Sequence, residues 1–421
     1  MNTKVYYLSN GIPVIICNTS FHTCKILISL GFGASDEAPH EYGITHFIEH
    51  LLGQSVTGEK NFGYLKNKIE ALGGCISLYT NYEKIACFVN TLPEHLIDAI
   101  EIIAPQITSP SFNTKSIEHE KHIILDEYKR YTSNNSWHFF KHETLFKNTE
   151  LEHCVLGTEE TIQSFTTEML LEYYFSHLSK NKTNIVVVGP IYNSTKLLTE
   201  LEKKFGKIPS TPSTQREHKY LAIQPTFKHD LKTDLKNIKI AFAFSPKISY
   251  DRKTQNNIGL FRKILQDRLM NALRYKNGLV YSIQCLTMGI PNTKLYTIET
   301  EITQKNIEPV IKTIANVCKN ILTTEPVTQE ELQHAKNVIK FNNALIMDSV
   351  DKSCNLHSQH MLHYNSMYNI NYEAQILNEI QPSDIQNTAH IFLNANLSIV
   401  SQGSDLGCNI MKLWQDFFKH S

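Results

Sequence analysis

Two histidines and a glutamate near residue 50 form the pattern with the most restricted chemistry in this sequence of 421 residues. His46, Glu49 and His50 spell His-x-x-Glu-His, the inverted form of a zinc-peptidase signature. In a helix, positions 46 and 50 lie about one turn apart on one face, so both imidazoles can reach the same ion. A catalytic zinc ion takes three protein ligands and a water molecule. One protein ligand therefore has to come from elsewhere in the chain.

Glu49 lies beside the two histidines and suits a different role. A carboxylate next to a metal-bound water can remove its proton as the water attacks a carbonyl carbon. The motif stands in an apolar stretch, Ile44 to Leu52, which predicts a helix that packs against a core and ends near Gly53. The alternative is a buried helix whose histidines only form hydrogen bonds, because five-residue patterns also arise by chance.

A second predicted helix, over residues 116–128, carries the acidic residues that can complete such a site. Glu120 and Glu127 are about two helical turns apart and share a face, whereas Glu118 and Asp126 point elsewhere. Taken alone, all of them are equally consistent with charges on a solvated helix face.

These motifs resemble the pitrilysin family of zinc peptidases, in particular its short two-domain branch, which includes mitochondrial processing peptidase and bacterial processing-type peptidases. In that family a ligand glutamate follows the motif after the 76 residues that separate His50 from Glu127, and another glutamate precedes it by seven positions. The resemblance implies that His46, His50 and Glu127 bind zinc. It also implies that Glu49 is the catalytic base and that Glu120 supports the site from behind the ligands.

Residues 69–80 and 84–90 alternate as two strands of a hairpin would. The resemblance implies that the edge of the first strand holds an extended substrate by main-chain pairing. The family usually has Asn-Ala where this chain has Ser77 and Leu78. This departure leaves a substrate contact by Ser77 open, and an ordinary core strand is an equally good interpretation.

The chain also contains an internal repeat. The segment around Phe112 resembles the segment around Val327 at an offset of 215, and the apolar run before Gly189 resembles the run before Gly403 at an offset of 214. Two nearly equal offsets indicate one duplicated unit. The predicted fold class is therefore α+β, with two homologous domains that each have a mostly antiparallel sheet with helices packed on it.

The repeat and the composition of the connecting segment predict the domain boundaries. Residues 1–206 form an N-terminal domain with the metal motif, and residues 226–421 form its homologue. Residues 207–225, rich in Pro, Ser and Thr, are the linker. Only the first copy has the metal-binding residues, because the positions equivalent to its two glutamates are Ala335 and Asn342.

Arg274 and Tyr281 are the candidate functional residues of the second domain. Arg274 closes a predicted helix, Gly278 can cap it, and a strand starts near Tyr281. The resemblance implies that this domain binds substrate, with Arg274 gripping its backbone and Tyr281 stabilising the developing oxyanion. Without the resemblance, an arginine in a last helical turn and a tyrosine at a strand start need no function.

Three further histidines, His357, His360 and His363, recur at three-residue intervals. They could line one helical edge as an adventitious metal site, but no carboxylate motif accompanies them, so a polar helix face is the preferred interpretation.

Composition excludes several classes of protein. Lys+Arg and Asp+Glu both number 41, so net charge supports neither a nucleic-acid partner nor an anionic membrane surface. The nine cysteines contain no Cys-x-x-Cys and are interpreted as reduced thiols.

No apolar run approaches the length of about 20 residues that spans a bilayer. The N-terminus lacks the pattern of a signal or transit peptide, so a cytoplasmic location is expected.

The predicted function is that of a zinc-dependent endopeptidase, with one Zn²⁺ per chain, that hydrolyses unfolded peptides or extended presequences. The resemblance implies a homodimer, because short chains of the family pair around a chamber, while a heterodimer with an inactive homologue stays open. The alternatives are a non-catalytic structural or assembly subunit of the same fold and a zinc-loaded protein that only binds peptides.

Overall fold

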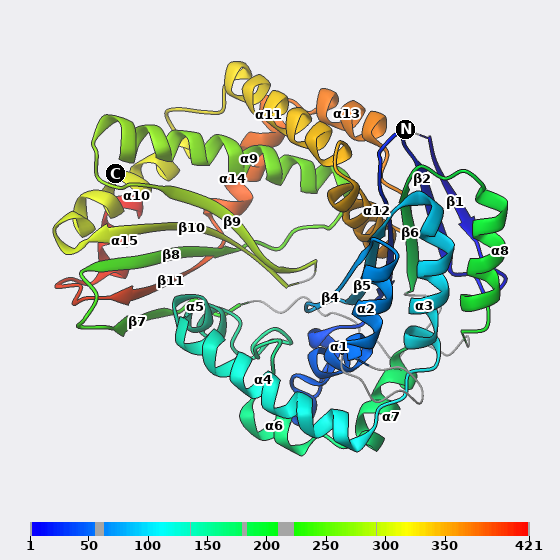
Figure 1. Ribbon diagram of the computed structural model, residues 1–421. Helices are drawn as coiled ribbons and strands as arrows, with labels where there is room; N and C mark the ends of the chain where they lie inside the picture. The colour runs from blue at the N-terminus through cyan, green and yellow to red at the C-terminus, as the bar shows by residue number, and fades with distance from the viewer. Residues whose placement is uncertain are drawn as a thin grey trace. The chain divides into compact units, whose positions relative to one another are not determined.

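Two sheets, each in its own compact unit, organise the protein (Figure 1). The computed structural model describes residues 2–54, 63–134, 136–178, 183–208, 223–291 and 293–419. The first compact unit takes residues 1–134, 153–217 and 344–368, and the second takes residues 135–152, 218–343 and 369–421.

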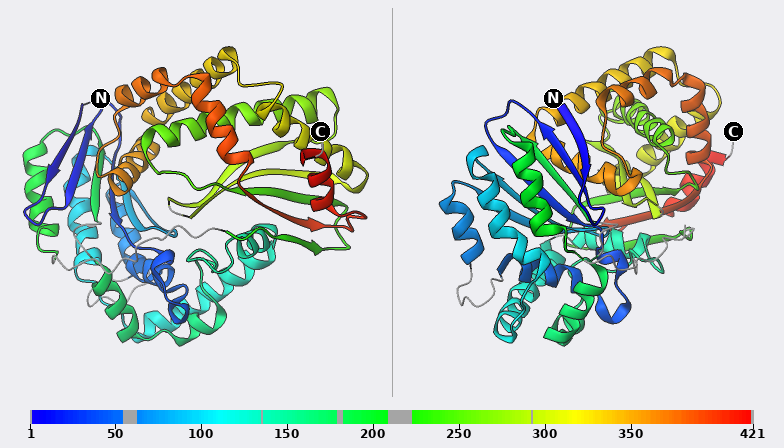
Figure 2. Two further views of the ribbon diagram at one scale, coloured as in Figure 1. Left: turned by 180° about the vertical axis from the view of Figure 1, so that it is seen from behind. Right: turned by 90° about the vertical axis from the view of Figure 1, so that its right-hand side faces the viewer.

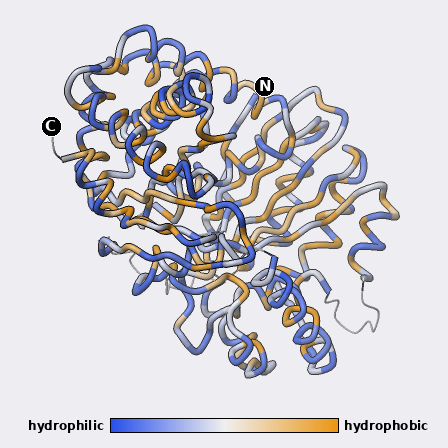
Figure 3. The backbone as a smooth tube through the Cα atoms, turned by 90° about the vertical axis from the view of Figure 1, so that its left-hand side faces the viewer, coloured by the Kyte–Doolittle hydropathy of each residue, from blue (hydrophilic) through white to orange (hydrophobic). Residues whose placement is uncertain are grey.

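The sheet of the first unit has the strand order β1-β2-β6-β3-β5-β4. Its strands are β1 (Asn2–Tyr7), β2 (Pro13–Asn18), β3 (Cys24–Leu30), β4 (Cys75–Thr80), β5 (Ile85–Thr91) and β6 (Asn184–Gly189). β2 and β6 are parallel, and all other neighbours are antiparallel. β3 and β6 are buried along their whole length, as expected of strands covered on both faces. Figure 3 shows the matching concentration of apolar residues along the sheet strands.

The sheet of the second unit has the order β7-β11-β8-β10-β9. Its strands are β7 (Phe227–Leu231), β8 (Asn237–Ser245), β9 (Ile283–Ile290), β10 (Thr293–Thr303) and β11 (Asn396–Gly403). β7 and β11 are parallel, and the other neighbours are antiparallel. Without β1, the first sheet has the same sequence of parallel and antiparallel neighbours. The predicted fold class, two similar α+β domains with mostly antiparallel sheets, is confirmed.

Helices pack on both sheets. Those of the first unit are α1 (Ile44–Gln54), α2 (Tyr64–Ala71), α3 (Leu96–Thr108), α4 (Thr114–Asn134), α6 (Glu159–Ser164), α7 (Thr167–His177), α8 (Ser194–Phe205) and α12 (Val350–Tyr364). Those of the second unit are α5 (Ser136–Leu145), α9 (Arg252–Met270), α10 (Ile307–Leu322), most of α11 (Gln329–Met347), α13 (Ile370–Glu379), α14 (Pro382–Leu393) and α15 (Ile410–Lys419).

The two units exchange one helix each. α12 comes from the second half of the chain but packs on β3 and β6 of the first sheet (Figure 2). Its residues Cys354 and Met361 meet side chains such as Leu27, whose neighbours Ile26 and Ile28 belong to the core on the other face of the sheet. In the same way, α5 from the first half of the chain packs on β8 and β11, the equivalent strands of the second sheet.

This exchange bears on the predicted division into residues 1–206, 207–225 and 226–421. Cuts at single positions cannot describe units that each take a helix from the other half of the sequence. Most of the predicted linker, residues 209–222, lies outside the described residues. The boundaries therefore stay a prediction. Within the described ranges, none of the helices combines the length and apolar character that crossing a bilayer requires.

His357 of α12 corrects the expectation of a polar helix face, because its side chain is fully buried. Neither ring nitrogen has a hydrogen-bond partner within the described part of the chain, and burial lowers the pKa of His357 from 6.5 to about 4. The unfolded chain therefore binds this proton more tightly, so the free energy of unfolding falls as the pH drops from 6.5 towards 4.

We expect His357→Leu to remove most of this decrease in the free energy of unfolding at low pH. A shift from 6.5 to about 4 corresponds to about 3 kcal/mol of unfolding free energy. Denaturant unfolding at pH 8 and at pH 4.5 measures the difference, with the exposed His119→Leu as the control. An equal loss of stability on acidification in wild type and His357→Leu would contradict the assignment.

Candidate metal centre

Helix α1 carries the His-x-x-Glu-His motif, and its local sequence explains its placement. Ile44, Phe47, Ile48, Leu51 and Leu52 are each at most 1% exposed and form the stripe that packs into the core of the first unit. The predicted helix is confirmed, but the expected stop at Gly53 is wrong, because the helix continues through Gly53 to Gln54, the last residue described in this part of the chain. The motif therefore projects from a rigid element.

The side chains of His46, His50 and Glu127 converge. Helix α4, which carries Glu127, packs against α1, and one potential ligand atom from each of the three residues lies within 4.8 Å of the others. Glu127 Oε2 is 3.5 Å from His50 Nε2 and 3.9 Å from His46 Nε2. Two ligand atoms of one tetrahedral zinc ion are separated by about 3.3 Å. The three groups thus surround a space of the size that a small cation needs.

This is the only cluster of its kind within the described ranges of the chain. His357, His360 and His363 do not form another one: His363 Nε2 lies 3.0 Å from Glu83 Oε1, and the His360 ring packs edge-on against Tyr368.

Glu120 lies behind the cluster. It is fully buried and its Oε2 accepts a hydrogen bond from His50 Nδ1, 2.8 Å away. A hydrogen on Nδ1 leaves the lone pair of Nε2 facing Glu127, which is the tautomer that a metal-binding histidine needs. The alternative of a solvated helix charge is therefore wrong for Glu120. Glu127, with its side chain 40% exposed, lies at the mouth of the site.

The charges of the site favour a cationic occupant. Burial acts to lower the pKa of His50, but the carboxylates of Glu120, Glu127 and Glu49 outweigh it and raise that pKa to about 9. Contact with His50 lowers the pKa of Glu127. Burial and the charge of His50 lower the pKa of His46 to about 4. One imidazole is thus kept neutral while the surrounding carboxylates attract one positive charge, whether a proton or a metal ion.

Glu49 occupies the inner side of the site. Its Oε2 is 3.9 Å from His46 Nε2, and its side chain is 15% exposed. Burial raises the pKa of Glu49, while the charge of His50 and hydrogen bonds with Thr80 oppose this shift. A carboxylate with a raised pKa is a stronger base than an exposed one, as proton abstraction requires. The sequence did not identify Thr80, which lies at the end of β4 and could have been found only from the pairing of α1 with that strand.

β4 is an edge strand, with β5 on one side only among the described residues. The predicted first strand is wrong at its beginning, because residues 69–71 form the last turn of α2 and the strand starts at Cys75. Ser77 pairs with Phe88 of β5. The free edge makes main-chain pairing with an extended peptide available.

Arg274 and Tyr281 lie in the second unit, where both are exposed. A π-helical turn, Asn271–Lys276, follows α9 and contains Arg274. The positive φ of Gly278 and its N–H donated to Arg274 O confirm the predicted end of the helix. The guanidinium carbon of Arg274 lies 5.0 Å from the ring centroid of Tyr281 and 5.8 Å from that of Tyr275. Tyr275 was not predicted, and a second exposed aromatic residue therefore belongs to this group.

Comparison with known proteins agrees with this geometry. A family model described as "Insulinase (Peptidase family M16)" matches residues 14–159, and one described as "Peptidase M16 inactive domain" matches residues 164–339. The second match covers the half in which Ala335 replaces the buried glutamate of the first.

Relatives that match most of this chain have related names. The chain is 23% identical to an uncharacterized zinc protease of Rickettsia felis, over 96% of this chain and 98% of that protein. It is 25% identical to the mitochondrial-processing peptidase subunit beta of Mus musculus, over 86% of this chain and 76% of that protein. A protease from Helicobacter pylori has a similar fold, with a TM-score of 0.83 at 17% identity over 96% of this chain and 99% of that one. By its sequence motifs, its two matching domain models and its fold, the chain belongs to the M16 family of peptidases, the insulinase or pitrilysin family.

Proposed function

We propose that this protein is a zinc-dependent endopeptidase that hydrolyses unfolded peptides or extended presequences. The observation that carries the proposal is the convergence of His46, His50 and Glu127, with Glu120 holding His50 in the metal-binding tautomer. The names of the relatives, which include zinc proteases, support the same metal.

The residues of the first unit have different proposed roles. His46, His50 and Glu127 would hold one zinc ion per chain. When bound, zinc lowers the pKa of its water and polarises the substrate carbonyl. Glu49 removes a proton from the attacking water and returns it to the leaving nitrogen, which balances the protons of the hydrolysis. Glu120 keeps the proton on His50 Nδ1 and thereby fixes the orientation of that ring.

The substrate would bind as an extended strand along the free edge of β4. Main-chain pairing recognises any extended segment and tolerates many side chains, so folded proteins are excluded and unfolded peptides are accepted. Ser77 and Leu78 of β4 differ from the usual family pattern, and we propose that they contribute to substrate preference.

We further propose that Arg274 binds the substrate backbone and that Tyr281 stabilises the oxyanion. The combined substitutions Arg274→Ala and Tyr281→Phe are expected to lower kcat/KM by about 100-fold or more, because preorganised donors contribute about that much each. Both side chains are exposed, so folding and zinc content are expected to stay unchanged. Steady-state kinetics with zinc analysis measures both, and Lys276→Ala on the same turn is the control. Unaltered kinetics in the double variant would assign these residues a structural role only.

A homodimer is the proposed assembly, and a heterodimer with an inactive homologue is the alternative, as the name of the relative "subunit beta" suggests. Light scattering of the purified protein gives its mass, and activity of that sample alone decides between the two. The cytoplasmic location stays a prediction.

A non-catalytic subunit is the second candidate function. The fold is shared with a peptidase M16 inactive domain from Pseudomonas fluorescens, with a TM-score of 0.82, and with a chain of complex III from Candida albicans, also with a TM-score of 0.82. The complete set of ligands and base in this chain favours the enzyme.

One experiment separates the candidates. The purified protein is expected to contain about one zinc per chain and to cleave an unstructured peptide library, with activity lost on chelation and restored by zinc. Zinc without cleavage would favour a protein that only binds peptides. Neither zinc nor cleavage would favour the structural subunit.

A further inference from the structure

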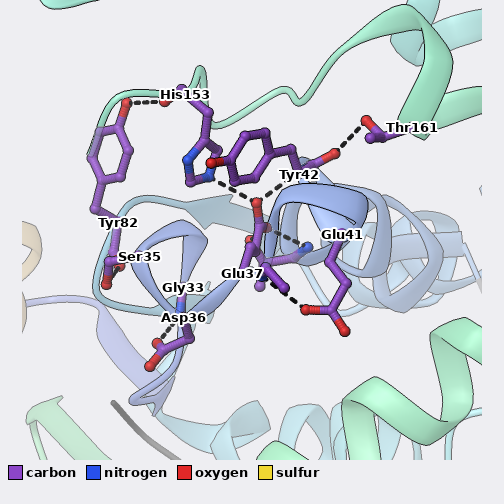
Figure 4. A network of polar contacts seen from close by, with 12 residues as sticks. Gly33, Ser35, Asp36, Glu37, Glu41, Tyr42, Tyr82, His153 and Thr161 are labelled. Carbon is purple, nitrogen blue, oxygen red and sulfur yellow. Dashed lines mark hydrogen bonds and ion pairs between the residues drawn. The ribbon is translucent and has the colours of Figure 1, made fainter. Parts of the chain in front are cut away.

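The carboxylate of Glu37 lies at the start of helix α1 and accepts several hydrogen bonds (Figure 4). It accepts hydrogen bonds from the backbone N–H groups of Gly43, at 2.8 Å, and Thr45, at 2.9 Å. The Thr45 hydroxyl donates to it at 2.5 Å, and His153 Nε2 donates at 3.0 Å. The side chains of Glu37 and His153 are 0% and 4% exposed. A buried carboxylate with this many donors is held rigidly.

His153 is itself fixed by its surroundings. Its ring stacks on Tyr42, with centroids 3.7 Å apart and planes at 5°. Its carbonyl oxygen accepts a hydrogen bond of 2.8 Å from the hydroxyl of Tyr82, in the turn between β4 and β5. Thr161 closes the group by donating from Oγ1 to the carbonyl oxygen of Tyr42 at 2.6 Å. The group thus joins the segment before α1, the hairpin turn and the start of α6.

Two backbone segments lie in close contact beside this group. Gly43 has φ +91°, and a Cβ placed on it would lie 2.6 Å from the carbonyl oxygen of Leu156 and 2.7 Å from the Cα of Gly157. The residue before α1 is therefore in direct contact with the segment that follows His153.

The contacts of Glu37 lead directly to the residues of the metal site. Thr45, which bonds to Glu37 through both N–H and hydroxyl, precedes His46 in the chain. Its carbonyl oxygen accepts a hydrogen bond of 3.5 Å from Oγ1 of Thr80. Thr80 in turn hydrogen-bonds to Glu49. A shift of the first turn of α1 would therefore move a metal ligand and the base relative to β4.

We propose that Glu37 and His153 are positioning residues for the proposed peptidase reaction: they hold the metal-binding helix in register with the strand along which the substrate binds. The inference rests on the proposed function. A simple helix cap would need only local acceptors for the first N–H groups. Here the acceptor also binds a histidine 116 positions away in the chain, and that histidine is tied to the hairpin that includes β4.

Two variants test the pair, and a third is the control. Glu37→Gln keeps the shape but places an amide N–H opposite a donor. His153→Phe keeps an aromatic ring against Tyr42 and removes the Nε2 donor, so it tests the pair even if Glu37→Gln does not fold. The control is Glu41→Gln. Glu41 lies four residues after Glu37, and its carboxylate accepts a hydrogen bond from the Ala38 N–H.

We expect both test variants to lower kcat by about 10- to 100-fold with KM nearly unchanged, and to weaken zinc binding by a similar factor, as loss of outer partners of metal ligands does. The visible spectrum of the cobalt-substituted protein should change in both variants and stay as in wild type in Glu41→Gln. Lower thermal stability with unchanged kcat, metal affinity and cobalt spectrum would show a structural role only and overturn the inference. If wild type binds zinc but cleaves no peptide, the proposed function fails, while zinc affinity and the cobalt spectrum still decide the positioning role.

Discussion

Glu49→Gln is expected to abolish peptide cleavage and to leave zinc bound. Glutamine matches the shape of glutamate and can keep the contact with Thr80, but it cannot accept a proton from water. Loss of a general base costs about 10²- to 10⁴-fold in rate. The three proposed metal ligands are not altered, so metal content should stay at the wild-type value. Cleavage of a fluorogenic unstructured peptide, followed together with zinc analysis of the same sample, measures both effects.

The control for this substitution is Glu118→Gln. Glu118 is an exposed glutamate of α4 that pairs with Lys121 at 2.8 Å, so its loss removes the same charge without touching the site. Full activity is expected for the control. Turnover by Glu49→Gln equal to that of wild type would show that another group activates the water, and the mechanism would then be wrong.

Glu127→Ala is expected to lower zinc affinity more strongly than any substitution outside the three ligands. It removes one of three protein donors, whereas loss of an outer partner such as Glu120 costs about 10- to 100-fold in affinity. The Glu127 side chain is 40% exposed, so its truncation is compatible with folding. Competition with a chromogenic chelator measures the affinity, and activity should fall in parallel and recover in part at high zinc concentration.

Asp126→Asn is the control for this effect. Asp126 is the exposed neighbour of Glu127 on the same helix, so the variant has the same change in charge near the site without the loss of a ligand. Zinc affinity in Glu127→Ala equal to that of Asp126→Asn would exclude Glu127 as a ligand and leave the convergence of the three side chains without a metal function.

Local sequence was sufficient for the elements that carry the site. The period of the apolar residues around His46 predicts helix α1, and the spacing of Glu120 and Glu127 places both on one face of α4. Local sequence could not assign different roles to Glu120 and Glu127. That difference arises because α1 packs over one end of the shared face, which buries Glu120 against His50 Nδ1 and leaves Glu127 half exposed opposite Nε2.

Local sequence patterns could not predict the contacts between distant segments of the chain. The strand predicted from residue 69 began too early, because alternation of apolar residues persists through the last turn of α2. His357 was expected on a polar face, but α12 packs on the sheet of the first unit and buries it. No local signal indicates that a helix from the second half of the chain covers a sheet built from the first half.

The sequence by itself determined the identity and spacing of the proposed metal ligands and the duplicated α+β architecture, because these depend on residue type and on the period of helices and strands. Only the tertiary structure decided which nitrogen of His50 faces the metal site, which helices are exchanged, and that Glu37 and His153 meet at the start of α1. These features depend on contacts between residues up to hundreds of positions apart, and such contacts are selected by packing and burial of the whole unit and not by local propensity.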